Sequence, residues 1–328
     1  MKFLLTAINA KFIHSNPAIY SLRAGAGEKL QPYVELAEFT INESLESILE
    51  GIWKRQPKVI GFSCYIWNWK LIREILTELP KILPDTEIWL GGPEVTYDGP
   101  GLLREFPQVT GIMVGEGEVT FREVLDHYVR EAESTGQSEQ QPEPDSIEQQ
   151  AADRTGTVAG KSVAERFGQI SGLCLASGYT APRELTDLTT LPFLYEDMEP
   201  FTNRIIYYET SRGCPYRCSY CLSSIDKKVR LRDIDVVKRE LQFFLDQNVK
   251  QVKFIDRTFN CDHKHAMEIW EYIYKHDNGV TNFHFEISAD ILREEEIVLL
   301  NRFRPGLAQL EIGVQSTNPE TIRAIHRV

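Results

Sequence analysis

Short apolar runs alternate with amphipathic stretches through most of the amino-terminal half of this chain. Runs of strand length occupy residues 3–8, 59–64, 87–90 and 111–114, with a weaker strand expected over 35–39. Between them, apolar residues recur at helical spacing over residues 18–30, 42–54, 70–79 and 121–128. This alternation predicts a doubly wound, Rossmann-like α/β domain, in which a parallel sheet carries helices on both faces.

Loops that follow the strands are informative because ligands bind such sheets at the carboxyl ends of the strands. Here they span residues 9–16, 63–68, 91–94 and 115–118. Glycines in the last two loops would let a backbone approach a bulky flat ligand, although tight turns explain them equally well. Cys64 is expected to pack in the core, and His14 to be an ordinary polar loop residue. The residues alone indicate a domain for a nucleotide-like or corrin-like ligand over 1–130.

The same alternation returns after residue 200. Strands are expected over residues 205–209, 251–255, 283–288 and 308–314, and helices over 233–247, 263–275, 294–303 and from 319 onward. Four βα units in a row predict part of a TIM-type (β/α) barrel over 201–328, with its functional residues at the strand carboxyl ends. The polar side chains at those ends are Asp256, Glu286, Ser288, Gln315 and Ser316.

Residues 131–160 break both patterns. They hold seven acidic residues against one arginine, a net charge of −6, and show no usable hydrophobic periodicity. A disordered acidic insert is therefore expected over 131–168, as a solvated spacer rather than an interaction segment. Order is expected to resume with an added strand or hairpin at 170–175, where Cys174 packs, in a connector that spans 169–200.

Composition bounds the remaining possibilities. The chain has 328 residues, of which 42% are hydrophobic and 26% charged, as in a soluble protein of two domains. Its net charge of −12 gives no support to nucleic-acid binding. No apolar run reaches membrane-spanning length and no signal peptide is visible, so a cytoplasmic location is expected.

Three of the six cysteines fall within eight residues, on a loop that leaves a predicted strand. They are Cys214, Cys218 and Cys221, and thiolates this close can converge on one soft metal centre. Such clustering favours a metal over disulfides, and three ligands leave a position open. The alternative is a zinc site completed by Cys261 or His263, although only the last two cysteines of the loop have zinc-hook spacing.

The spacing Cys-x3-Cys-x2-Cys, with Tyr220 before the last cysteine, resembles the signature of the radical S-adenosylmethionine (radical SAM) superfamily. This resemblance implies a 4Fe–4S cluster held by the three cysteines, with S-adenosylmethionine on the fourth iron. Reductive cleavage would give a 5′-deoxyadenosyl radical, and a flavodoxin or ferredoxin is implied as reductant. The implied S-adenosylmethionine contacts are Tyr220, Asp256, Glu286, Ser288, Gln315 and Ser316. Asp256 stands where the family often has Gly-Gly-Glu.

The amino-terminal half resembles the cobalamin-binding domain of the cobalamin-dependent branch of this superfamily. Its matching segments are residues 63–68, 91–94 and 115–118. The implied cobalamin contacts are Asn9, His14, Ser63, Tyr65, Gly91, Gly92, Glu94, Gly115 and Glu116. The motif Asp-x-His-x-x-Gly is absent, so ligation of cobalt by His14 is not expected.

Together the two resemblances imply an enzyme that uses both cofactors to methylate an unactivated carbon. The same cofactors could instead serve a rearrangement, cyclisation or oxidation. A non-catalytic iron–sulfur or cobalamin binding fragment is a third interpretation, because the family's barrel has six βα units and four fit before Val328. Either the chain is a fragment or another chain supplies the rest. Neither a catalytic residue nor a substrate can be named.

Overall fold

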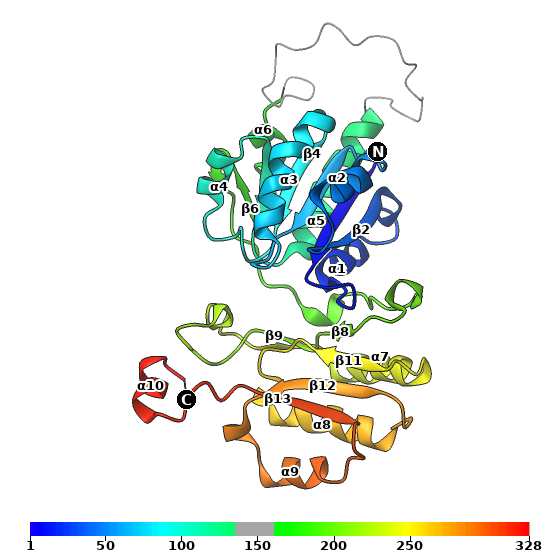
Figure 1. The fold of residues 1–328 in the computed structure, drawn as a ribbon, viewed down its shortest axis with the longest axis vertical. Helices are drawn as coiled ribbons and strands as arrows, with labels where there is room; N and C mark the ends of the chain where they lie inside the picture. The colour runs from blue at the N-terminus through cyan, green and yellow to red at the C-terminus, as the bar shows by residue number, and fades with distance from the viewer. Residues whose placement is uncertain (135–160, 328) are drawn as a thin grey trace, which may run out of the picture. The chain divides into compact units, whose positions relative to one another are not determined.

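The computed structural model describes residues 1–134 and 161–327, which belong to two compact units, Met1–Thr186 and Asp187–Val328 (Figure 1). Both units are α/β, as the sequence predicts.

The first unit is built on a seven-stranded sheet in the order β2-β1-β3-β4-β5-β6-β7. Neighbouring strands from β1 to β5 pair in parallel, and β6 and β7 add an antiparallel edge. The strands are β1 (Phe3–Asn9), β2 (Val34–Thr40), β3 (Val59–Ser63), β4 (Glu87–Gly91), β5 (Val109–Met113), β6 (Leu173–Leu175) and β7 (Gly178–Tyr179). The five parallel strands confirm the predicted strand positions to within two residues.

Helices cover both faces of this sheet, because alternate residues of its buried strands are apolar on both sides. In β1, for example, Leu4 packs in one core cluster and Phe3 and Leu5 in the other. The helices on the first side are α2 (Leu45–Trp53), α3 (Trp69–Ile82) and α4 (Gly99–Glu105). Those on the second side are α1 (Pro17–Gly25), α5 (Gly117–Ser134) and α6 (Val163–Phe167).

In the first unit, one predicted helix extends too far and another helix was missed. The helix expected over 18–30 ends at Gly25, since Gly27 has the left-handed φ of +77° and a short 3₁₀ turn, η1 (Gln31–Tyr33), follows. Helix α4 was missed, because its Gly-Pro-Gly start carries no apolar periodicity.

The acidic insert was predicted over 131–168. Residues 131–134 belong to α5, and α6 begins after Ser162 with a capping box to Glu165. Residues 135–160 of the insert lie outside the described residues. The expected connector divides between the units: β6 and β7 complete the first sheet, whereas residues 187–200 hold only the 3₁₀ turns η2 (Leu188–Thr190) and η3 (Glu199–Phe201).

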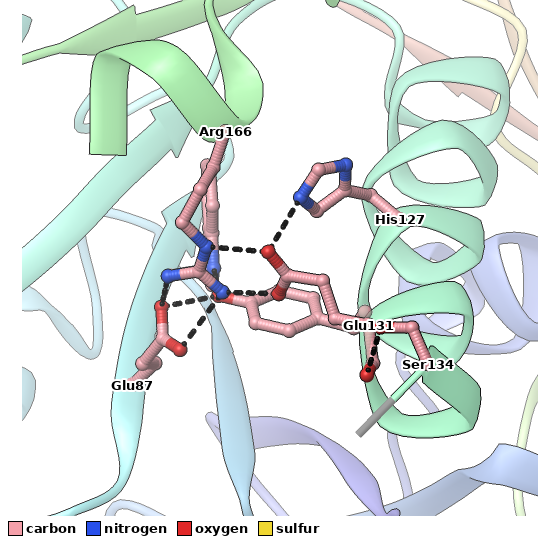
Figure 2. A network of polar contacts seen from close by, with 7 residues as sticks. Glu87, His127, Glu131, Ser134 and Arg166 are labelled. Carbon is pink, nitrogen blue, oxygen red and sulfur yellow. Dashed lines mark hydrogen bonds and ion pairs between the residues drawn. The ribbon is translucent and has the colours of Figure 1, made fainter. Parts of the chain in front are cut away.

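A buried arginine ties α6 to the first sheet (Figure 2). Arg166 donates two hydrogen bonds to Glu87, at 2.9 and 3.1 Å, and two to Glu131, at 3.0 and 2.8 Å. Its guanidinium lies over the ring of Phe167, 4.7 Å from the centroid, and His127 contacts Glu131 at 2.9 Å. The network therefore anchors the segment that follows the insert to β4 and α5, at the amino-terminal end of β4.

The second unit has a four-stranded parallel sheet in the order β13-β12-β11-β8, which confirms the four predicted βα units. The strands are β8 (Ile206–Tyr208), β11 (Gln251–Phe254), β12 (Asn282–Ile287) and β13 (Ala308–Ile312). A separate two-stranded antiparallel ribbon, which the sequence did not predict, consists of β9 (Ser211–Arg212) and β10 (Arg230–Leu231).

One face of this second sheet packs on helices through aromatic side chains. The helices of this unit are α7 (Ile234–Asp246), α8 (His263–Lys275), α9 (Glu294–Leu300) and α10 (Pro319–Ala324). The aromatic contacts with the sheet come from α7 and α8, whereas α10 buries none of its residues. Phe254 of β11 and Phe285 of β12 lie 4.5 Å apart between ring centroids, and Phe285 also contacts Trp270 of α8. Asp233 caps α7 by accepting from two backbone amides. The other face of the sheet carries the polar side chains considered below.

Candidate functional site

The cysteine loop is residues 213–229, the segment that the β9–β10 ribbon closes at its base. Gly213 has a φ of +95°, and a Cβ at this position would collide with the carbonyl oxygen of Lys228. The backbone N–H of Cys214 donates to Asp226 O at 2.9 Å, so the loop returns on itself where its first cysteine begins. Only glycine fits this turn without strain.

Within the loop, Cys214 and Cys218 are buried and Cys221 is partly exposed. Cys221 N donates to Cys218 O at 3.1 Å, which closes a tight turn between the last two cysteines. Among the described residues, no group of three His, Cys, Asp or Glu side chains is arranged to hold a metal ion. The loop thus supplies the donor chemistry of an iron–sulfur site, three thiols within eight residues, and their assignment as ligands stays a prediction.

Asp256, two residues after β11, anchors Thr210 and Ser211, the residues that lead into the cysteine loop. Its carboxylate accepts hydrogen bonds from Thr210 N at 3.1 Å, Thr210 Oγ1 at 2.7 Å and Ser211 Oγ at 2.5 Å. The side chain is 1% exposed, and burial raises the pKa of Asp256 against the opposing effect of these bonds. Both carboxylate oxygens are engaged within the protein, so the geometry gives Asp256 a structural task that its position alone did not reveal.

A second anchor joins the loop to the ends of β11 and β12. Asn260 and Ser288 exchange two hydrogen bonds of 2.9 Å, between the Asn260 side chain and the Ser288 backbone. The hydroxyl of Ser288 donates to Asp290 at 2.6 Å and also meets Tyr216 of the cysteine loop. Cys214 Sγ lies 3.5 Å from Thr258 Oγ1. Asn260, Tyr216 and Thr258 were not among the predicted site residues, since no motif marks them.

The other predicted barrel residues lie on the polar face or in the following loops. Glu286 is on the face opposite α8, with one oxygen 3.3 Å from Lys253 Nζ. Gln315 has a left-handed φ of +65°, and Ser316 Oγ accepts from Asn318 N at 3.1 Å. Tyr220 is half exposed, and its hydroxyl accepts from Arg327 at 3.1 Å.

The two extra residues of the zinc alternative, Cys261 and His263, are not gathered with the loop cysteines into a metal-holding group in the described part of the chain. Nδ1 of His263 lies 2.8 Å from Glu296 Oε1. Burial raises the pKa of Cys261 to about 11.

In the first unit, a partly buried hydrogen-bond network fixes the loops after β1 and β3. Glu38, at the end of β2, accepts from Asn9 Nδ2 at 2.6 Å and from Tyr20 OH at 2.6 Å. Asn16 donates to Ser63 Oγ at 3.0 Å and caps α1. The network brings two predicted residues, Asn9 and Ser63, to one edge of the sheet.

Asn68 holds the loop that follows β3. It is fully buried, donates to Ser63 O at 2.9 Å and to Ile8 O at 3.0 Å, and accepts from Tyr65 N at 2.8 Å. Tyr65 stacks on Trp67 with ring centroids 4.4 Å apart. His14 follows β1 and donates its backbone N–H to Lys11 O at 3.1 Å. Asn68, Asn16 and Glu38 were missed, because a lone amide or carboxylate gives no sequence signal.

The glycine loops after β4 and β5 differ in what surrounds them. Gly92 has a φ of +109°, and a Cβ there would lie 2.5 Å from Cys64 O, while Gly91 O accepts from Cys64 N at 2.7 Å. Gly115 also has a left-handed φ, +80°, but a Cβ would meet nothing within 4 Å. The first loop is therefore locked onto β3, whereas the space beside the second is open to a ligand.

The acidic residues of these two loops are placed by backbone contacts. Glu94 N donates to Cys64 O at 3.4 Å, and Glu116 Oε2 accepts from Thr186 N at 2.7 Å. Cys64 is fully buried, and burial raises its pKa to about 12, which confirms it as a packing residue. Cys174, also fully buried in this unit, packs as predicted.

No helix in the described part of the chain is long and apolar enough to cross a bilayer.

Comparison with known families divides the chain in the same way. Residues 4–125 match the B12 binding domain, and residues 208–328 match the Radical SAM superfamily. Both resemblances drawn from the sequence are thereby confirmed.

Three curated relatives match most of the chain. The uncharacterized methyltransferase PH0819 of Pyrococcus horikoshii is 26% identical over 86% of this chain and 57% of its own length. The cobalamin-dependent radical SAM methyltransferase TokK of Streptomyces tokunonensis is 28% identical over 62% of this chain and 28% of its own. The anaerobic magnesium-protoporphyrin IX monomethyl ester cyclase of Rubrivivax gelatinosus is 25% identical over 83% and 46%. The chain thus spans less than two thirds of each relative.

Solved structures agree on the fold. The cobalamin-dependent S-adenosylmethionine radical enzyme OxsB superposes with a TM-score of 0.70 at 17% identity, over 98% of this chain and 45% of that one. The radical S-adenosylmethionine methyltransferase TsrM from Kitasatospora setae gives 0.67 at 18% identity, over 98% and 61%.

Proposed function

This chain is a radical SAM protein that carries a B12 binding domain, and we propose that it is an enzyme that methylates an unactivated carbon. Its cofactors in this proposal are a 4Fe–4S cluster, S-adenosylmethionine and cobalamin. The observation that carries the proposal is the joint presence of the two domains, with a three-cysteine loop at the carboxyl end of β8 in the second.

Cys214, Cys218 and Cys221 would hold the cluster, because three cysteine thiols are suitable donors for its iron atoms. When bound, the cluster would supply the electron that cleaves S-adenosylmethionine into methionine and a 5′-deoxyadenosyl radical. The protein's own part is to hold the loop still: Asp256 fixes Thr210 and Ser211, which lead into the loop, and Ser288 contacts Tyr216 within it. A rigid support for the ligating loop is what such a site requires.

The S-adenosylmethionine contacts that we propose are Tyr220, Glu286, Ser288, Gln315 and Ser316, all on the cysteine loop or at strand ends. Asp256 is proposed to support the site indirectly. Its oxygens accept hydrogen bonds from Thr210 and Ser211, so it positions the cysteine loop rather than contacting S-adenosylmethionine. Glu286 offers a carboxylate that is about one third exposed on the polar face of the sheet.

Cobalamin is proposed to lie against the strand-end loops of the first unit. The open space beside Gly115 and the exposed side chain of Trp67, stacked on Tyr65, would suit a broad, flat ring system. The other contacts proposed there are Asn9, His14, Ser63, Gly91, Gly92, Glu94 and Glu116. The network around Glu38 and Asn68 would keep these loops in place before the ligand binds.

A second candidate keeps the cofactors and changes the outcome. The Rubrivivax relative is described as a cyclase rather than a methyltransferase, so a cyclisation or another non-methylating radical reaction is the competing proposal. Our proposal includes a flavodoxin or ferredoxin as the reductant and names no substrate.

Anaerobic reconstitution with iron and sulfide, followed by dithionite and S-adenosylmethionine, tests the proposal. We expect 5′-deoxyadenosine from the chain and none from a Cys218→Ala control. S-adenosylhomocysteine formed alongside it would favour methyl transfer over the cyclase-type reaction. If the reconstituted chain makes no 5′-deoxyadenosine above the control, both enzyme proposals fail for this chain. If it takes up no hydroxocobalamin, the proposal for the first unit fails.

A further inference from the structure

Four ionisable side chains meet on the polar face of the second sheet, within its strands rather than in its loops. Lys253 comes from β11, His284 and Glu286 from β12, and Glu311 from β13. Their neighbours Phe254, Phe283 and Phe285 point to the opposite, fully buried side, so all four stand on the face away from α8.

The sheet register places two of these carboxylates where they repel each other, and Lys253 offsets that repulsion. Glu286 and Glu311 are direct partners in the β12–β13 pairing, and like charges directly opposite one another repel. The ammonium of Lys253 lies between them, 3.3 Å from Glu286 Oε1 and 3.0 Å from Glu311 Oε2. A single cation thus sets the direction of two facing carboxylates.

Charge and burial are consistent with this bridge. Burial opposes a charge on Lys253, but its bond to Glu311 and the charge of Glu286 outweigh burial and raise its pKa. The bond from Lys253 also lowers the pKa of Glu311. His284 Nε2 lies 3.0 Å from Glu311 Oε2 without the geometry of a hydrogen bond, and burial lowers the pKa of His284. Lys253 is therefore the cation that holds the two carboxylates at neutral pH.

We propose that Lys253 is a positioning residue, which orients the Glu286 carboxylate for S-adenosylmethionine by bridging it to Glu311. This inference rests on the proposed function, in which Glu286 contacts that ligand. Glu286 lies one residue before the end of β12, directly opposite Glu311 near the end of β13. Lys253 is paired with His284, two residues before Glu286, and its side chain extends to both carboxylates. Without the ammonium, the two carboxylates would repel and Glu286 would turn away or take up a proton.

A closely matched control exists in the same unit. Lys238 of α7 bridges to Glu268 of α8 at 2.7 Å, with exposed fractions of 29% and 32% for the two side chains, against 22% and 35% for Lys253 and Glu286. Lys238→Met removes an ion pair of similar exposure from the helical layer. Lys253→Met removes two from the polar face, those with Glu286 and Glu311. A merely structural role predicts the same effect for both.

The experiment measures 5′-deoxyadenosine formation by the reconstituted chain against S-adenosylmethionine concentration, with the electron paramagnetic resonance spectrum of the reduced cluster as a second readout. In Lys253→Met we expect the KM for S-adenosylmethionine to rise about tenfold, as for one lost charge-assisted contact. Lys238→Met should leave KM unchanged, and Lys253→Arg should restore most of the affinity, because it keeps the charge.

A double variant makes the test specific. If Lys253 acts through Glu286, adding Lys253→Met to Glu286→Gln produces no further rise in KM. Equal KM values for Lys253→Met and Lys238→Met, or additive effects in the double variant, would overturn the inference while the proposed function stands. Should Lys253→Met fail to fold, Lys253→Arg and Glu286→Gln still decide: an unchanged KM in Glu286→Gln overturns it. A wild-type chain that makes no 5′-deoxyadenosine overturns the proposed function and this inference together.

Discussion

Replacing Asp256 by alanine removes the anchor of the cysteine loop and leaves three donors without their acceptor. The Thr210 N–H cannot turn elsewhere, and an unpaired buried amide costs about 1–3 kcal/mol. The hydroxyls of Thr210 and Ser211 each lose a bond worth about 1 kcal/mol net. The substitution also removes the free-energy cost of burying the carboxylate, which offsets part of this loss. We expect the free energy of unfolding of the second unit to fall by about 3 kcal/mol.

Urea unfolding of the cluster-free chain, read by pulsed hydrogen–deuterium exchange, measures this free energy for the second unit alone. Asp246→Ala is the control, since among the described residues that exposed carboxylate accepts only from Gln242 on the same helix, and it should change the free energy by less than about 0.5 kcal/mol. After reconstitution, Asp256→Ala should also retain less iron than the control. If Asp256→Ala unfolds within about 1 kcal/mol of wild type and keeps its iron, the anchoring role is refuted.

Three further predictions concern other parts of the fold. Arg166→Met leaves two carboxylates without their shared guanidinium, so urea unfolding should show the first unit destabilised by about 3 kcal/mol; a loss below about 1 kcal/mol would contradict the ion-pair geometry. Gly92→Ala should cost at least about 2 kcal/mol because of its φ and the nearby carbonyl, and Gly115→Ala only about 1 kcal/mol, so equal losses would be inconsistent with the loop surroundings. Burial lowers the pKa of His265 below its ordinary 6.5, so the unfolded chain binds the proton more tightly and stability should fall as pH drops through 6.5; a pH titration of unfolding with the same slope in His265→Asn would contradict this.

The strands could be predicted because burial on both faces leaves a continuous apolar run, as in Val59–Ser63. Helix α4 could not be predicted, because its first three residues are Gly-Pro-Gly and it packs against β6, which lies much later in the sequence. The β9–β10 ribbon has two residues in each strand, too few for any period to show.

Candidate positions were easier to predict than roles. A polar residue at a strand end, such as Asp256, is visible in the sequence, but its partners Thr210 and Ser211 are more than forty residues away along the chain. The bridge from Lys253 to Glu286 and Glu311 depends on the register of three strands, which no local pattern specifies.

The central claim, that this chain supports radical SAM chemistry, is tested most directly by one measurement. It is the yield of 5′-deoxyadenosine from the anaerobically reconstituted, dithionite-reduced chain with S-adenosylmethionine, compared with the Cys218→Ala variant treated identically. The account predicts 5′-deoxyadenosine with the wild-type chain and only background with the variant. Equal yields from the two would contradict it.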